Sequence, residues 1–159
     1  MDPTRRIGGK NGSKRHLLVD ARGAPLSLIV TGANRHDVSQ LESVLEKIMV
    51  RRSNPPLRRS KHLCADAAYT GLKAQIAIRN QGYIAHVVGR SQEAAVLKQK
   101  RGTKARRWIV EVAHSWFNRF RKLLVRYEKL HRSFVALNHL AAAIIVFRKI
   151  KFSVNIIYG

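Results

Sequence analysis

The stretch RRWIVEVAHSWFNRFRKLLVRYEK, residues 106–129, decides the fold of this chain. Its apolar side chains recur at intervals of three or four residues, which predicts one amphipathic helix packed on a core by Trp108, Val112, Trp116, Phe120, Leu123 and Tyr127. A single carboxylate, Glu111, lies in the first turn, with His114, Ser115 and Asn118 as its helical neighbours. The remaining surface is Arg and Lys, so Glu111 is either an acid presented among cations or a charge that Arg107 compensates.

The composition of the whole chain indicates what it binds. Lys and Arg number 31 against nine Asp and Glu, a formal net charge of +22, while 45% of the residues are hydrophobic. A chain this apolar can bury one substantial core and does not read as a disordered basic tail. A folded domain this basic usually binds a polyanion, with nucleic acid favoured over an anionic membrane surface. Charge alone gives a class of partner and no reaction.

The sequence favours a protein that is not in a membrane and is kept in a reducing compartment. Residues 1–16 contain no apolar signal core, and the apolar run at residues 135–147 is too short to span a bilayer. The single cysteine, Cys64, excludes an intramolecular disulfide and a cysteine-rich zinc site.

The order of hydrophobic runs and turn residues predicts a mixed α/β domain. Residues 1–15 are a Gly-rich basic start, in which Lys14 and Arg15 are candidates for phosphate contacts. A β-hairpin follows at residues 16–20 and 26–31, then a helix that opens at Asp37, where an N-cap role is favoured over a metal role. We expect strands at residues 62–65 and 83–88, helices at 72–80 and 134–150, and a tail at 151–159.

Only two of the acids combine an apolar setting with a position that can face a cleft. Asp66 follows the strand at residues 62–65, and groups at the carboxyl ends of strands face the ligand crevice of an open α/β sheet. Glu111 is the other. Mg²⁺ and Mn²⁺ prefer carboxylate oxygens, so the pair is a candidate metal site. The structural alternative for Asp66 is to cap the next helix.

Three ordered segments carry a family resemblance. GSKRHLLVDARGAPLSLIVTGANRHD (residues 12–37), LCADAAYTG (63–71) and RWIVEVAHSWFNRFRKLLVRYE (107–128) resemble the catalytic domain of DDE transposases of bacterial insertion sequences. The resemblance implies an RNase H-like mixed sheet flanked by helices over residues 16–150. It also implies Mg²⁺ or Mn²⁺ bound by Asp, Asp and Glu. Asp66 matches the second Asp, Glu111 the Glu, and Arg107 the Arg of the family's Tyr-Arg-Glu-Lys signature.

The chain also departs from that pattern. Lys104 stands where the signature has Tyr, and Asn118 where it has Lys, with Arg119 beside it. The family's first Asp lies on a strand upstream of the hairpin, and the only upstream acid here is Asp2, a weak candidate without an apolar strand around it. The sequence therefore predicts a domain that lacks its first strand, as in a truncated copy or the downstream product of a split reading frame.

Two classes of function follow from the resemblance. The first is Mg²⁺-dependent DNA cleavage and strand transfer at insertion-sequence ends, alone or completed by an upstream transposase fragment. The second is a catalytically inactive, basic DNA-binding remnant. Both imply contacts with transposon ends and target DNA, a homo-oligomer, and a cytoplasmic, nucleoid-associated location in a bacterium. The expected DNA contacts are Lys14, Arg15, Arg107, Arg119, Arg121 and Lys122.

Overall fold

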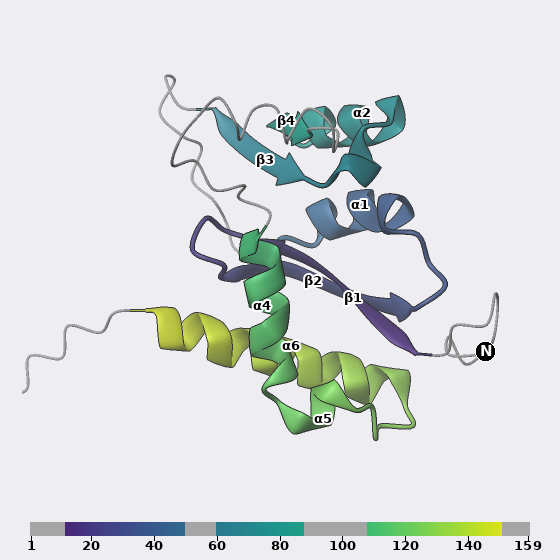
Figure 1. Ribbon diagram of the computed structural model, residues 1–159, viewed down its shortest axis with the longest axis vertical. Coiled ribbons are helices and arrows are strands. Elements are labelled where there is room, and N and C mark those ends of the chain that lie inside the picture. The colour runs from purple at the N-terminus through teal and green to yellow at the C-terminus, as the bar shows by residue number, and fades with distance from the viewer. Residues whose placement is uncertain (1–11, 50–59, 88–107, 151–159) are drawn as a thin grey trace, which may run out of the picture.

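The computed structural model describes residues 12–49, 60–87 and 108–150, which form a mixed α/β structure (Figure 1). In chain order the strands are β1 (Ser13–Val19), β2 (Pro25–Gly32), β3 (Lys61–Ala65) and β4 (Tyr83–Val87). The helices are α1 (Asp37–Glu46), α2 (Leu72–Asn80), α4 (Trp108–Asn118), α5 (Arg121–Leu124) and α6 (His131–Lys149), with a 3₁₀ turn, η1 (Ala67–Tyr69), after β3. The expected hairpin, α/β order and last helix are confirmed.

The first strands form the predicted antiparallel hairpin. Ser13 pairs with Gly32 and Leu17 with Leu28, and the register shifts between Leu18 and Val19. Gly23 sits in the turn with φ +79°, a conformation that side chains with a Cβ rarely adopt. This turn lies against α4, because a Cβ on Gly23 would come within 3.1 Å of the Trp116 ring.

The second pair of strands is parallel, with Lys61 opposite Tyr83 and Ala65 opposite Val87. Helix α2 connects the two strands, as parallel pairing requires a crossover. Within the described residues the four strands form two separate two-stranded sheets, β1–β2 and β3–β4. The single mixed sheet expected from the sequence is therefore not observed in this part of the chain.

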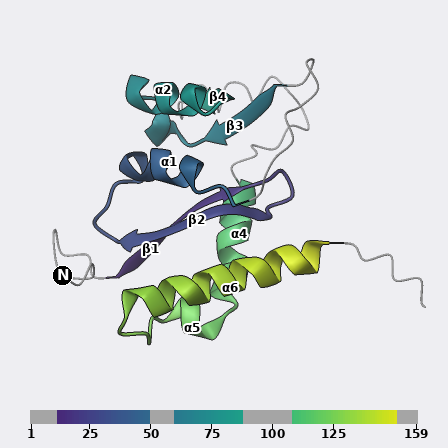
Figure 2. The ribbon, with the colours of Figure 1, turned by 180° about the vertical axis from the view of Figure 1, so that it is seen from behind.

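The hairpin takes part in two hydrophobic cores, one on each face. The larger core joins Leu28 and Val30 of β2 to helices α4, α5 and α6 through Phe117, Leu123, Phe134, Ala141, Ala142 and Ile145. The smaller core joins α1, α2, β3 and β4 through Leu41, Leu45, Leu63, Ala74, Ile78 and Tyr83. Leu17 packs on the first core and Leu18 on the second, since adjacent strand residues face opposite sides. The hairpin accordingly lies between α1 and α6 in Figures 1 and 2.

The prediction of one continuous helix over residues 106–129 is wrong, because the chain forms two helices there. Helix α4 ends at Asn118, and α5 begins after Phe120, whose backbone is extended at φ −83° and ψ 105°. The break turns the chain so that Leu123 is buried in the larger core. A continuous helix would carry that side chain along the axis of α4, away from α6.

The predicted apolar stripe is also partly wrong. The fully buried side chains of α4 are Ala113 and Phe117, while Trp108 is 49% exposed and Tyr127, beyond α5, is 71% exposed. Trp116 and Phe120 pack on the edge of the core as partly buried residues. Ala113 and Phe117 each follow an expected position, Val112 or Trp116, so the buried face is turned by one residue from the expected one.

Helix α6 forms where the apolar run predicted a buried helix, but it is buried on one face only, since Leu140 is 58% and Phe147 61% exposed. Asn138, on the buried face, is fully buried. Its amide nitrogen donates to the carbonyl of Phe134 at 2.8 Å, four residues earlier on the same helix. Across residues 12–49, 60–87 and 108–150, no helix has the length and apolar character needed to cross a bilayer.

Candidate active site

Asp66 stands directly after β3, where the sequence analysis placed it. Its side chain is partly buried, and Oδ1 accepts the backbone N–H of Ala67 at 2.6 Å. Asp66 is thus the N-cap of η1, which is the structural role considered from the sequence. The cap engages Oδ1 and fixes the carboxylate at the carboxyl end of a parallel strand, so the structural role does not exclude a ligand-facing one.

Glu111 lies in the first turn of α4 and is exposed. His114 follows one turn later on the same helix, and burial lowers its pKa, with the charges of Arg15 and His16 adding to that effect. Helix α4 packs against β1, the strand that carries Arg15 and His16.

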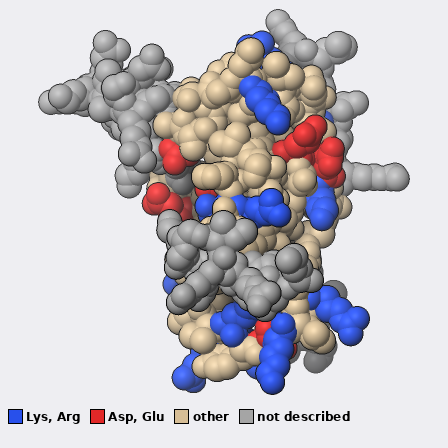
Figure 3. Space-filling model, turned by 90° about the vertical axis from the view of Figure 1, so that its right-hand side faces the viewer, with Lys and Arg blue, Asp and Glu red and all other residues tan. Residues whose placement is uncertain are grey.

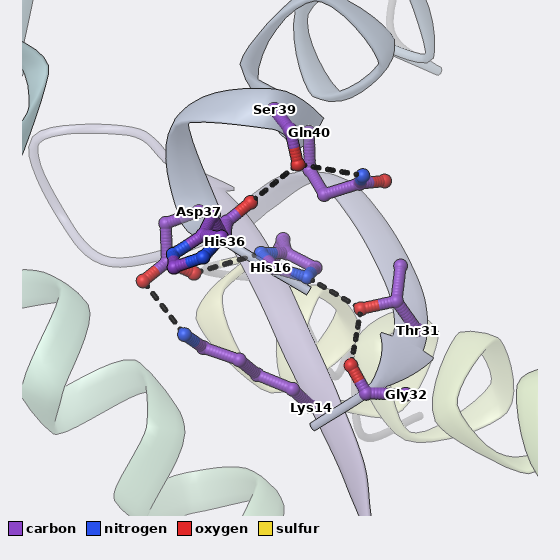
Figure 4. Close-up of polar contacts among 8 residues, drawn as sticks. All are labelled: Lys14, His16, Thr31, Gly32, His36, Asp37, Ser39 and Gln40. Carbon is purple, nitrogen blue, oxygen red and sulfur yellow. Dashed lines mark hydrogen bonds and ion pairs between the residues drawn. The ribbon is translucent and has the colours of Figure 1, made fainter. Parts of the chain in front are cut away.

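A hydrogen-bonded network that sequence analysis did not predict joins β1, β2 and the start of α1 (Figure 4). The carboxylate of Asp37 accepts from Lys14 Nζ at 2.7 Å through Oδ2 and lies 3.0 Å from His16 Nδ1 through Oδ1. His16 Nε2 lies 2.8 Å from the hydroxyl of Thr31. The N-cap role predicted for Asp37 is wrong: His36 is the N-cap of α1, and Asp37 ties the start of α1 to β1. The contact bridges 23 residues, which local spacing cannot reveal.

The charge of Asp37 also influences titratable groups on two other elements. Burial raises the pKa of Tyr69 to about 12, and the negative charges of Asp37 and then Asp66 add to the shift. On the other side, the charge of Asp37 raises the pKa of His114 against the larger effect of burial. The charge of Asp37 thus acts on Tyr69 of η1 and on His114 of α4.

Two of the predicted DNA contacts prove to be engaged within the protein. Lys14 is paired with Asp37, although 39% of its side chain stays exposed. Arg15 packs its guanidinium over the ring of Phe117, 5.3 Å from the centroid, and donates to the side-chain oxygen of Asn118. Burial lowers the pKa of Arg15, which marks it as a partly desolvated structural residue.

The other described cations on the predicted DNA-binding list are exposed. Arg119 lies between α4 and α5, and Arg121 and Lys122 lie on α5. Lys and Arg gather at the end of the molecule where α5 and the start of α6 lie (Figure 3). We call the exposed cations Arg119, Arg121, Lys122, Lys129 and Arg132 the basic end. Arg107 and Asp2, two further candidates, lie outside the described residues.

The candidate ligands Asp66 and Glu111 suit a divalent ion in their chemistry but not in their number. Carboxylates such as Asp66 and Glu111 offer the hard oxygen ligands that Mg²⁺ prefers. Their number is insufficient, because the described part of the chain assembles no group of three or more His, Cys, Asp or Glu side chains able to hold a metal ion. These residues fit the ion in chemical type, and a complete site needs a further ligand.

Comparisons with known proteins give the family. The transposase DDE domain family matches residues 63–148, more than half of the chain, and this range includes both Asp66 and Glu111. The chain is 35% identical, over 141 residues, to the transposase assigned to insertion sequence element IS402 of Burkholderia cepacia. The match covers 86% of this chain and 64% of that relative. No solved structure matches the chain. On the strength of the match over residues 63–148, the chain belongs to the transposase DDE domain family.

Proposed function

We propose that the chain is the catalytic part of a DNA transposase, which cleaves DNA at insertion-sequence ends and joins it to a target. The observation that carries the proposal is the placement of two carboxylates within the family-matched segment. Asp66 stands at the carboxyl end of β3, and Glu111 stands in the first turn of α4. Such strand ends and helix starts commonly face a ligand crevice in α/β proteins.

In this proposal Asp66 and Glu111 hold Mg²⁺ or Mn²⁺. When bound, such ions activate water or a 3′-OH for in-line attack at a phosphodiester and stabilise the leaving oxygen. The chain's own residues bind and orient the DNA: the basic end neutralises phosphates, and Lys14 presents one partly exposed ammonium group beside Asp37. Arg107, whose family counterpart is basic, is a further proposed contact.

The missing ligand is proposed to come with an additional strand, as an RNase H-like sheet requires. Within the described residues, β1 pairs only with β2 and β3 only with β4. Leu18 of β1 and Leu63 of β3 pack in the same core, so the two sheets approach each other there. A strand edge with unpaired N–H and C=O groups accepts a further strand. An upstream segment or fragment ending in Asp would join the sheets and bring a third carboxylate beside Asp66.

The same function sets the proposed partners and location. Holding two transposon ends together calls for more than one copy of the chain, so we propose a homo-oligomer on DNA. The substrate is the bacterial chromosome, and the proposed location is therefore the cytoplasm at the nucleoid.

A cleavage and strand-transfer assay on transposon-end DNA tests the proposal, using the chain with an upstream segment that supplies a strand ending in Asp. We expect Mg²⁺-dependent products, and we expect Asp66→Asn and Glu111→Gln each to lower the rate roughly 10²-fold or more. Glu46→Gln, which changes an exposed acid on α1, is the matched control and should retain activity. Equal activity in the Asp66→Asn variant would show that this carboxylate is only a cap.

The second candidate is a DNA-binding remnant without chemistry. It is favoured by the lack of a three-ligand group within the described residues. The same assay separates the two functions. Salt-dependent DNA binding with no divalent-ion-dependent product, with or without the upstream segment, would support the remnant.

A further inference from the structure

Several large apolar side chains are exposed at the end of α5 and in the connection to α6. Leu124 is 61% exposed, Tyr127 71% and Leu130 55%, all within seven residues of the chain. Single exposed apolar residues are common on protein surfaces, whereas a group of them, ringed by polar residues, marks an interaction site. We call Leu124, Tyr127 and Leu130 the exposed apolar group.

The connection is held in a fixed conformation by Arg126. Its Nη1 donates to Ser13 Oγ at 2.7 Å, and its Nε donates to the carbonyl of Glu128 at 3.1 Å. The guanidinium also lies over the ring of Phe134, 5.2 Å from the centroid. Arg126 thus ties the segment inward to β1 and α6, while the next residue, Tyr127, remains outside. A ligand that contacts Tyr127 would meet a backbone anchored at the preceding residue, at a smaller entropic cost than an unanchored loop demands.

The surroundings of the exposed apolar group are cationic. Arg121, Lys122, Lys129 and Arg132 are exposed within the same stretch of chain, and Glu128, half-buried, is the only acid between residues 119 and 132. Figure 3 shows the same gathering of Lys and Arg at this end of the molecule. An apolar group alone would suit a protein partner. An aromatic side chain among cations instead fits a polyanion that also offers flat apolar faces.

We propose that this surface binds DNA with unpaired bases, with Tyr127 stacking on a base while the neighbouring cations contact the backbone. The proposal rests on the DNA-binding function proposed above and specifies the form of DNA bound. In a duplex the base faces are covered by stacking, and only the base edges are accessible in the grooves. Single-stranded DNA exposes those faces, and its binding sites combine aromatic platforms with a basic track along the backbone.

The experiment measures binding of the full 159-residue chain to two fluorescent DNAs with the same stem. One is a blunt hairpin duplex, and the other carries a single-stranded thymidine overhang containing one 2-aminopurine. We expect Tyr127→Ala to weaken binding to the overhang DNA roughly tenfold and to leave blunt-duplex binding within twofold. Tyr127→Phe should restore binding, because the aromatic face is kept. Binding of the unaltered chain should quench the 2-aminopurine fluorescence, because Tyr127 stacks on the base. Binding of the Tyr127→Ala variant should leave that fluorescence unquenched.

Two controls separate stacking from charge and from general exposure. Phe147→Ala removes an aromatic side chain that is 61% exposed near the far end of α6, roughly 24 Å along the helix from its start. It should leave both affinities unchanged. Lys129→Gln should weaken binding to both DNAs. It should also make the slope of log affinity against log salt concentration shallower by about 0.7 to 0.9.

The outcomes are distinguishable. If the chain binds both DNAs but Tyr127→Ala affects neither or both equally, the stacking proposal fails and the proposed function stands. If the chain binds neither DNA in a salt-dependent manner, the proposed function fails as well. If Tyr127→Ala changes only the oligomeric state seen by size-exclusion chromatography, the surface is a contact between copies and the proposal is overturned.

Discussion

His16 shows at the residue scale how burial and hydrogen bonding set a protonation state. Only 5% of its side chain is exposed, and burial lowers its pKa from the ordinary 6.5, more than the nearby Asp37 raises it. A neutral ring satisfies both contacts when Nδ1–H donates to Asp37 and Nε2 accepts from the Thr31 hydroxyl. The hydroxyl has one proton, so protonation of Nε2 would turn it toward the Gly32 carbonyl, 3.2 Å away.

This protonation state predicts how stability depends on pH. Because the pKa of His16 is lower in the folded chain than in the unfolded chain, the unfolded state binds a proton first on acidification. The free energy of unfolding should therefore be steady above about pH 7 and fall as the pH drops through 6.5, by up to about 1.4 kcal/mol per pH unit for each such group. Urea titrations at pH 7.5 and pH 5.5 measure the change.

His114 contributes in the same direction, because its pKa is also lowered. His16→Gln should therefore reduce the acid-induced loss without abolishing it. An equal loss in His16→Gln and the unaltered chain would show that His16 is already protonated in the folded state.

At the scale of the element, α4 provides a test of which face carries the packing. Phe117 is fully buried, so Phe117→Ala should lower the free energy of unfolding by about 3–5 kcal/mol through the cavity it leaves. Trp108 is 49% exposed, and Trp108→Ala should cost less than about 1.5 kcal/mol despite the larger side chain. Urea denaturation of both variants gives the comparison. A larger loss of stability in Trp108→Ala than in Phe117→Ala would support the apolar stripe expected from the sequence.

The elements also show what periodicity can and cannot predict. The hairpin, α1, α2 and α6 were predictable because each is a run of local hydrophobic periodicity bounded by turn residues. The break at Phe120 was not, because the repeat of apolar residues continues across it and the reason for the turn is Leu123, which reaches a core made by distant residues. Likewise, Ala113 gave no signal in the predicted apolar stripe, although its side chain is fully buried.

In the candidate site, too, some features were predictable from the sequence and others were not. Asp66 and Glu111 are placed by the ends of their own elements, so their positions after β3 and in the first turn of α4 followed from the sequence. The partners of Asp37 and Arg15 depend on how β1 packs against α1 and α4, which no local pattern encodes. Asp37 was singled out from the sequence as a helix cap, and its pairing with Lys14 and His16 was missed.

At the scale of the whole molecule, the distribution of charge predicts how DNA affinity depends on salt concentration. Five exposed cations make up the basic end, so the logarithm of the duplex affinity should fall linearly with the logarithm of salt concentration, with a slope of about −4.5 if each contacts one phosphate. Replacing Arg121 and Lys122 together by Gln should make the slope shallower by about 1.8. Fluorescence anisotropy at several salt concentrations measures it.

Arg15→Gln is the matched control, because that guanidinium is packed on Phe117. It should lower stability and leave the salt slope unchanged. A salt-independent affinity in the unaltered chain would contradict the electrostatic origin of binding.

The hairpin between two cores has a consequence for how the protein emerges from the ribosome. Its contacts with the C-terminal half join residues 103 to 127 positions apart, such as Arg15 with Asn118 and Lys149 with Arg22. At a synthesis rate of about 5–20 residues per second, the finished hairpin waits on the order of ten seconds before α6 is made. During that interval Leu28 and Val30 lack the helices that bury them. The nascent chain thus exposes an apolar face of the hairpin that is prone to aggregation. Early binding of a chaperone should therefore raise the yield of folded protein.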